Sequence, residues 1–242
     1  MSGGAIFRET LGVVLRQRLP EASHEDILAT LEAAPREPLE FIYEAGAEAK
    51  LPHEDILVRG AAIYFNFCAG SLCDDLSDSD CYYLKEPYRV GPCVQAILQT
   101  LFFETLVKAK LPKSVLSSAA RELIAAVGVQ HVELHTRKWT AELFRKIAEG
   151  IGGRQWSAYL QILWCRTPLA LRAARIGMAA GIAVVVTEDM QSLDRRFATL
   201  SAADKYEIVA WAATAVKALR EEHVRCIDAL LCTIDPILRT VP

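Results

Sequence analysis

Residues 60–80 read GAAIYFNFCAGSLCDDLSDSD, and this stretch decides the fold class expected of the chain. Its first fourteen residues, Gly60 to Cys73, carry no charge, and four aspartates follow within the next seven. A helix that is apolar on every side is typical of the centre of a large helical core. The stretch therefore predicts a buried central helix that ends in a cluster of carboxylates.

Apolar residues recur with helical spacing along nearly all of the remaining sequence. We expect helices over residues 24–34, 40–50, 54–73, 94–110, 113–127, 129–149, 157–165, 169–183 and 202–231. Only residues 183–187 look strand-like, and they are too few to build a sheet. The sequence thus predicts an all-α protein, a single-domain helical bundle of about ten helices that spans residues 1–242.

Composition narrows the classes of function. The 242 residues include 27 Lys and Arg against 30 Asp and Glu, a net charge of −3, so the chain lacks the basic character of nucleic-acid-binding proteins. No uncharged stretch reaches the roughly 20 residues that a membrane span needs, and no signal peptide is recognisable. The seven cysteines form no CxxC pair. We therefore expect a cytoplasmic protein with no transmembrane segment and no nucleic-acid partner.

The acidic cluster predicts a metal site. Carboxylates at the carboxyl end of a helix are electrostatically unfavourable, which suggests that they have another purpose. Asp74 and Asp78 lie one helical turn apart on one face. Mg²⁺ typically binds one or two carboxylates together with water and phosphate oxygens. We predict that Asp74, Asp75 and Asp78, with Asp80 as an auxiliary ligand, hold Mg²⁺ and a diphosphate. The alternative is a solvated acidic loop in which Ser79 or Asp80 caps the next helix.

Residues 71–80, SLCDDLSDSD, resemble the first aspartate-rich motif of the trans-polyprenyl diphosphate synthases, in a divergent and short form. The turn at Glu86-Pro87-Tyr88 and the helix after it are similar to the Pro-Thr turn of that family. Residues 159–167 resemble its Lys-Thr motif, with Arg166 at the position of the lysine. The resemblance covers residues 55–180. It implies the class I isoprenoid synthase fold, in which helices surround a central apolar cavity.

The sequence departs from the family pattern at several points. It lacks the Gly-Lys-Arg segment near the N-terminus, and Leu84-Lys85 replaces the Arg-Arg pair after the first motif. The second acidic motif is missing as such. Glu221, Glu222 and Asp228 fall near its expected place, although a solvated helix face is the favoured interpretation of these three residues. The departures affect the joining of two isoprenoid units more than the binding of one allylic diphosphate.

The resemblance implies an Mg²⁺-dependent enzyme that uses prenyl diphosphates, a prenyltransferase of the polyprenyl synthetase type that ionises an allylic diphosphate. Asp74, Asp75 and Asp78 are then the catalytic metal ligands, and the implied substrate-binding residues are Lys85, Arg89, Arg166, Ala69 and Gly70. Ala69 and Gly70 would line the prenyl tunnel, although small residues also serve close helix packing. Taken alone, Arg166 fits an ordinary surface arginine on a helix better.

Three further interpretations stay open. The protein could be a class I terpene cyclase-like enzyme, which has no second diphosphate to hold. It could also be a non-catalytic prenyl-binding or regulatory subunit, since the second acidic motif is missing. In either case the expected partners are an allylic prenyl diphosphate and a second chain, in a homodimer or a hetero-oligomer. The third possibility is a helical protein unrelated to isoprenoids.

Overall fold

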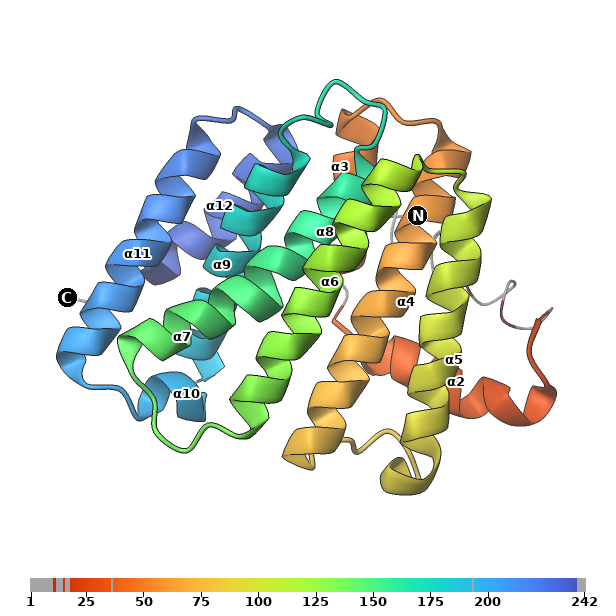
Figure 1. The fold of residues 1–242 in the computed structure, drawn as a ribbon, viewed down its shortest axis with the longest axis horizontal. Coiled ribbons are helices and arrows are strands. Elements are labelled where there is room, and N and C mark those ends of the chain that lie inside the picture. The colour runs from red at the N-terminus through yellow and green to blue at the C-terminus, as the bar shows by residue number, and fades with distance from the viewer. Residues whose placement is uncertain (1–10, 12–14, 16–17, 36, 193, 239–242) are drawn as a thin grey trace. The chain divides into compact units, whose positions relative to one another are not determined.

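The structure is a computed structural model that describes residues 11, 15, 18–35, 37–192 and 194–238 (Figure 1). These residues contain helices and no strand, which confirms the predicted all-α class. The elements are η1 (Glu21–Ser23), α2 (His24–Ala33), α3 (Glu37–Glu48), α4 (His53–Asp78), α5 (Pro87–Lys108), α6 (Lys113–Leu134), α7 (Ala141–Ile147), η2 (Ala148–Arg154), α8 (Gln155–Leu163), α9 (Ala173–Ser192), α10 (Arg195–Ala198), α11 (Ala202–Arg220) and α12 (Arg225–Leu238).

The helices group into two compact units, which divide between Leu111 and Pro112. The first unit includes α2 to α5, and the second includes α6 to α12. The expectation of a single domain over residues 1–242, with a central apolar cavity, stays a prediction.

Helix α4 is the centre of the first unit, as the apolar stretch predicts. Tyr64 and Phe65 are completely buried on it, and the Tyr64 hydroxyl donates a hydrogen bond to the carbonyl oxygen of Leu31 on α2. Helix α5 packs beside α4 (Figure 1). Near the start of α5, a Cβ atom added to Gly91 would lie 2.8 Å from a methyl carbon of Leu76. The absence of a side chain at Gly91 therefore lets α5 begin directly against the acidic end of α4.

The second unit is organised around α9. Helices α7, η2 and α8 follow one another without a break, and η2 is a π-helical segment that contains Gly150, Gly152 and Gly153. A Cβ atom on Gly152 would collide with the carbonyl oxygen of Gly181 on α9, and one on Gly181 would collide with that of Gly152. Two helices thus meet backbone to backbone, which only glycine permits. Two buried residues of α9, Thr187 and Asp189, are polar.

Three expectations about individual helices are wrong. Residues 183–187 belong to α9 and not to a strand, because burial among helices overrides the strand propensity of three consecutive valines. The helix expected over 202–231 is two helices, and His223 between them has a left-handed φ of 51°. The break expected near Gly128 does not occur, since α6 continues to Leu134.

Two helices, α4 and α5, are long and apolar enough to cross a membrane by length and composition alone. In their most apolar windows, 61% of the α4 residues and 33% of the α5 residues are buried inside the protein. Core helices of soluble proteins pass the same test, so the finding is weak. The absence of a transmembrane segment stays a prediction.

Candidate functional site

The aspartate cluster lies at the carboxyl end of α4, where the sequence places it. The helix ends at Asp78, and Ser79 terminates it with a left-handed φ of 65°. The backbone N–H groups of Ser79 and Asp80 both donate to the carbonyl oxygen of Asp75, the second over 2.8 Å. This left-handed cap closes the helix, so the four carboxylates gather at its negative end.

The four aspartates differ in their surroundings. Asp74, Asp78 and Asp80 are exposed, whereas Asp75 is partly buried. Burial raises the pKa of Asp75 above its usual value, and the neighbouring charges of Asp80 and Asp78 add to this effect. A hydrogen bond from the Tyr83 hydroxyl, 2.7 Å from Oδ2 of Asp75, acts in the opposite direction. Asp75 is therefore the carboxylate of this cluster that the fold holds in place.

Three tyrosines after α4 bind its acidic end, and the sequence analysis missed them. Besides Tyr83, the hydroxyl of Tyr82 donates to Oδ1 of Asp80 over 2.9 Å, and that of Tyr88 donates to Ser79 over 2.8 Å. The signal was the pair Tyr82-Tyr83 directly after the cluster. Burial, followed by the hydrogen bond to Asp75, raises the pKa of Tyr83, so this tyrosine stays a proton donor at neutral pH.

The donor set fits an Mg²⁺ ion that is shared with a ligand. Within the described part of the chain, no three His, Cys, Asp or Glu side chains are placed to hold a metal by themselves. Mg²⁺ does not need such a cage, because it usually takes one or two carboxylates and completes its shell with water and phosphate oxygens. Asp74 and Asp78 offer two exposed carboxylates one turn apart on α4.

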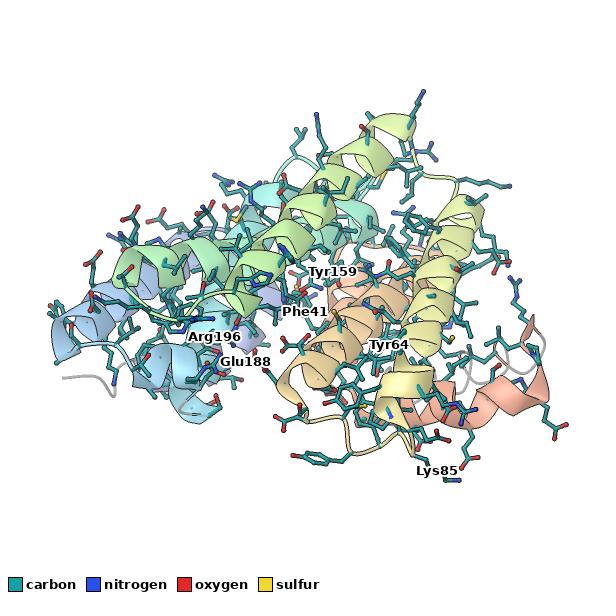
Figure 2. All side chains as sticks on the ribbon, turned by 60° about the horizontal axis from the view of Figure 1, so that its bottom comes forward. Phe41, Tyr64, Lys85, Tyr159, Glu188 and Arg196 are labelled. Carbon is teal, nitrogen blue, oxygen red and sulfur yellow. The ribbon has the colours of Figure 1, made fainter. Side chains whose placement is uncertain are left out.

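Lys85 and Arg89 stand in the loop after α4 and in the first turn of α5. Nζ of Lys85 lies 3.0 Å from Oε1 of Glu25 on α2, and Arg89 pairs with Glu86 over 2.9 Å. Figure 2 labels Lys85 at the surface of this loop. Both ion pairs are exposed, and such pairs contribute little to stability. The two cations can therefore leave these partners for a diphosphate at small cost.

The two residues expected to line the tunnel lie on α4, one turn before the cluster. Ala69 is completely buried and Gly70 is partly buried. Their role in a tunnel stays a prediction.

Arg166 belongs to the second unit and follows α8. It is exposed and has a left-handed φ of 62°, an uncommon conformation for a residue with a side chain. The next residue, Thr167, fixes this turn, because its hydroxyl donates to the carbonyl oxygen of Trp164 over 2.7 Å. Within the described residues, the Arg166 guanidinium makes no ion pair.

The expected solvated helix face holds for the exposed Asp228 but is wrong for Glu222, which lies in the turn between α11 and α12. Glu222 lies 2.7 Å from both Arg172 and Arg175, and its side chain is only 10% exposed. It therefore joins the turn between α11 and α12 to the start of α9. Glu221, in the turn after α11, and Asp228, on α12, are exposed.

A polar cluster in the second unit was also missed. Arg196 on α10 lies 2.5 Å from Glu133 on α6, 2.7 Å from Asp189 on α9 and 2.9 Å from Asp194. Figure 2 labels Arg196 and, next to it, Glu188. Burial raises the pKa of Asp189 to about 7, although the charge of Arg196 opposes this shift. The signal was the acidic pair at the end of the apolar α9, a pattern that repeats that of α4.

No protein-family model matches the sequence, and no curated protein matches it. Solved structures do match. A geranyltransferase from Legionella pneumophila is 17% identical, with a TM-score of 0.71 over 98% of this chain and 93% of the other. A geranylgeranyl pyrophosphate synthetase from Geoglobus acetivorans is 11% identical, with a TM-score of 0.76 over 97% and 95%. The geranyl diphosphate synthase small subunit from Antirrhinum majus is 16% identical, with a TM-score of 0.62 over 89% and 90%. The chain therefore has the all-helical isoprenoid synthase fold of these proteins.

Proposed function

We propose that this protein is an Mg²⁺-dependent enzyme that ionises an allylic prenyl diphosphate and transfers the prenyl group. One observation carries the proposal. Two exposed carboxylates, Asp74 and Asp78, share a face at the end of an apolar helix, in a fold whose solved examples include a geranyltransferase and a geranylgeranyl pyrophosphate synthetase.

Each aspartate of the cluster has its own role in the proposed enzyme. Asp74 and Asp78 bind Mg²⁺ through their exposed oxygens, Asp75 adds the carboxylate that Tyr83 orients, and Asp80 assists. The bound metal would stabilise the negative charge that develops on the diphosphate as it leaves. Lys85 and Arg89 supply positive charge for the diphosphate oxygens, and the diphosphate-binding role that the resemblance implies for Arg166 stays a prediction. A guanidinium can bind two phosphate oxygens at once, which favours Arg166 in this role.

An apolar environment next to the cluster protects the allylic cation from water. Ala69 and Gly70, one turn before the first aspartate, line this environment in the proposed enzyme. Because both are small, they leave room for a prenyl chain. All seven cysteines are thiols and not disulfides, which supports a reducing, cytoplasmic location.

The experiment measures diphosphate release from geranyl, farnesyl and geranylgeranyl diphosphates with and without Mg²⁺. The Asp74→Asn/Asp75→Asn double variant is expected to abolish release. The matched control is Glu221→Gln/Asp228→Asn, which also removes two carboxylate charges, both of them exposed and both in the second unit. Equal release by the aspartate variant and the parent would contradict the proposal.

A non-catalytic subunit is the second candidate, and two observations favour it. One matching structure is named a small subunit. In addition, the second acidic motif is missing as such, and Glu222 near its expected place is paired with Arg172 and Arg175. Mg²⁺-dependent binding of a prenyl diphosphate without any release would select this candidate. Release with a cyclic product would instead select a terpene cyclase-like enzyme, which the missing Gly-Lys-Arg segment slightly favours. A homodimer, or a hetero-oligomer with a catalytic chain, is part of either proposal.

A further inference from the structure

A pocket of about 440 Å³ lies in the second unit, between the loop that joins α6 to α7 and the short helix α10. None of the residues proposed for prenyl diphosphate chemistry lines it. We name this feature the basic pocket, because three of its six lining residues are cations; the lining residues are Thr136, Arg137, Lys138, Trp139, Arg195 and Thr199.

The three cations of the basic pocket are not neutralised by the protein. Within the described residues, none of Arg137, Lys138 and Arg195 makes an ion pair, and all three side chains are exposed. Two of the carboxylates closest to them in sequence are already engaged, and a third, Glu142, is exposed and does not line the pocket. Glu133 and Asp194 both bind Arg196, at 2.5 Å and 2.9 Å. The fold therefore pairs these two carboxylates with Arg196, and the three cations of the basic pocket form no ion pair with the described residues.

The other lining residues suit an anionic ligand. Trp139 is 9% exposed and forms a rigid apolar wall. The hydroxyls of Thr136 and Thr199 donate to backbone carbonyl oxygens one turn earlier, over 2.9 Å in each case. These bonds are easily exchanged for others, because the hydroxyl groups lie at the surface. No carboxylate lines the pocket to repel an anion.

We propose that the basic pocket binds a phosphate-bearing ligand, with the phosphate oxygens held between Arg137 and Arg195. Guanidinium groups bind phosphate through paired, charge-assisted hydrogen bonds, and the ammonium of Lys138 adds a compact third charge. Three cations that converge without counter-charges also raise the local concentration of anions. The ligand can be a free phosphate compound or the headgroup of an anionic lipid, since both present the same chemistry.

The test uses inorganic diphosphate as its probe and isothermal titration calorimetry with EDTA present, so that no metal site contributes. The parent is expected to bind diphosphate, and binding weakens as the salt concentration rises. The Arg137→Gln/Arg195→Gln double variant should lose about tenfold or more in affinity, because it removes two charge-assisted contacts. The control is Arg121→Gln/Lys217→Gln, which removes two exposed cations elsewhere in the second unit that form no ion pair with any described residue, and it should bind like the parent.

A second arm separates the two sources of phosphate. Sedimentation with phosphatidylcholine vesicles, with and without phosphatidylglycerol, detects binding to a lipid headgroup. Loss of diphosphate binding in the double variant supports a free phosphate ligand. If the double variant still binds diphosphate and loses only its binding to phosphatidylglycerol vesicles, the result supports a lipid headgroup. Equal binding by the double variant and the control would overturn the proposal, as would a parent that binds neither probe.

Two further measurements keep the result interpretable. Lys138→Gln alone removes one exposed charge and should also lower the affinity for diphosphate. This single variant therefore tests the basic pocket even if the double variant folds poorly. The Asp74→Asn/Asp75→Asn variant should bind diphosphate in EDTA as the parent does. Failure of the basic pocket can thus be told apart from failure of the proposed prenyl diphosphate chemistry.

Discussion

The hydroxyl of Tyr83 lies 2.7 Å from Oδ2 of Asp75, and this hydrogen bond ties the loop after α4 to the acidic end of the helix. It satisfies one oxygen of the carboxylate whose pKa is raised by burial. A tyrosine thus holds the aspartate that the proposed chemistry needs in a fixed orientation.

Replacement of this tyrosine by phenylalanine tests the relationship. Tyr83→Phe leaves a partly buried carboxylate oxygen without its donor, so the free energy of unfolding should fall by about 1–3 kcal/mol. Urea denaturation measures the change. The matched control is Tyr82→Phe, which removes a hydroxyl bound to Asp80 from a side chain that is fully exposed. The control should unfold like the parent, and equal destabilisation of the two variants would contradict a special role for Tyr83.

Asp189 should make the stability of the protein depend on pH. Its pKa is raised to about 7 in the folded protein, from 3.8, so between these values the folded state binds a proton that the unfolded state has lost. Stability from this group is therefore greatest at low pH and falls as pH rises through about 7. A shift of this size corresponds to a few kcal/mol, on the order of 4.

Asp189→Asn removes the titrating group but keeps an oxygen that can accept the hydrogen bond from Arg196. The difference in unfolding free energy between pH 5 and pH 8 should be smaller in this variant than in the parent. Asp228→Asn, at an exposed position, is the control and should retain the parent's pH dependence. An unchanged pH dependence in Asp189→Asn would show that another group is responsible.

The parts of the structure that could be predicted from the sequence are those set by local patterns. The apolar run from Gly60 to Cys73 predicted the buried α4, and the aspartates after it predicted the end of that helix to within five residues, because α4 continues from Cys73 to Asp78. Local propensity failed at Val184 to Val186, where three β-branched residues favour a strand but lie in the central helix of the second unit.

Contacts between distant segments could not be predicted. Arg196 forms ion pairs with both Asp189 and Glu133, and Glu133 lies 63 residues earlier in the chain. No local periodicity predicts such a contact. The bond between Tyr83 and Asp75 spans only eight residues, but it depends on the left-handed turn at Ser79. Hydrogen bonds of this kind follow from the path of a loop, and only the structure supplies that path.

Two glycines in helices should respond in opposite directions to the same substitution. A Cβ atom on Gly181 would collide with the carbonyl oxygen of Gly152, so Gly181→Ala must push η2 and α9 apart. We expect it to lower the free energy of unfolding by about 1–3 kcal/mol or more. A Cβ atom on Gly128 in α6 meets nothing within 4 Å. Gly128→Ala should therefore raise stability by about 0.5–1 kcal/mol, because alanine favours the helix.

Thermal and urea unfolding of the two alanine variants measure this difference. Their chemical change is identical, so effects of the added methyl group on the unfolded chain are similar in both. A gain in stability for Gly181→Ala would mean that the backbones of η2 and α9 do not meet as closely as described.

Arg166 allows its proposed role in binding to be separated from its role in folding. Arg166→Gly removes the cation and also replaces a left-handed non-glycine residue, with φ of 62°, by the residue that prefers this conformation. The relief of backbone strain is offset by the greater freedom of glycine in the unfolded chain, so stability should stay within about 1 kcal/mol of the parent's. If Arg166 binds the diphosphate, the KM for a prenyl diphosphate should nevertheless rise about tenfold or more.

The matched control is Lys110→Gly. Lys110 is also an exposed cation just after a helix, with a left-handed φ of 48°, and it makes no ion pair within the described residues. Both variants thus lose one charge and one strained side chain. Only Arg166→Gly should raise KM, because only Arg166 stands where the resemblance places a diphosphate-binding cation. A parallel rise of KM in both variants would reflect the overall charge of the protein. If KM rises in neither variant, Arg166 is an ordinary surface arginine that does not bind the diphosphate.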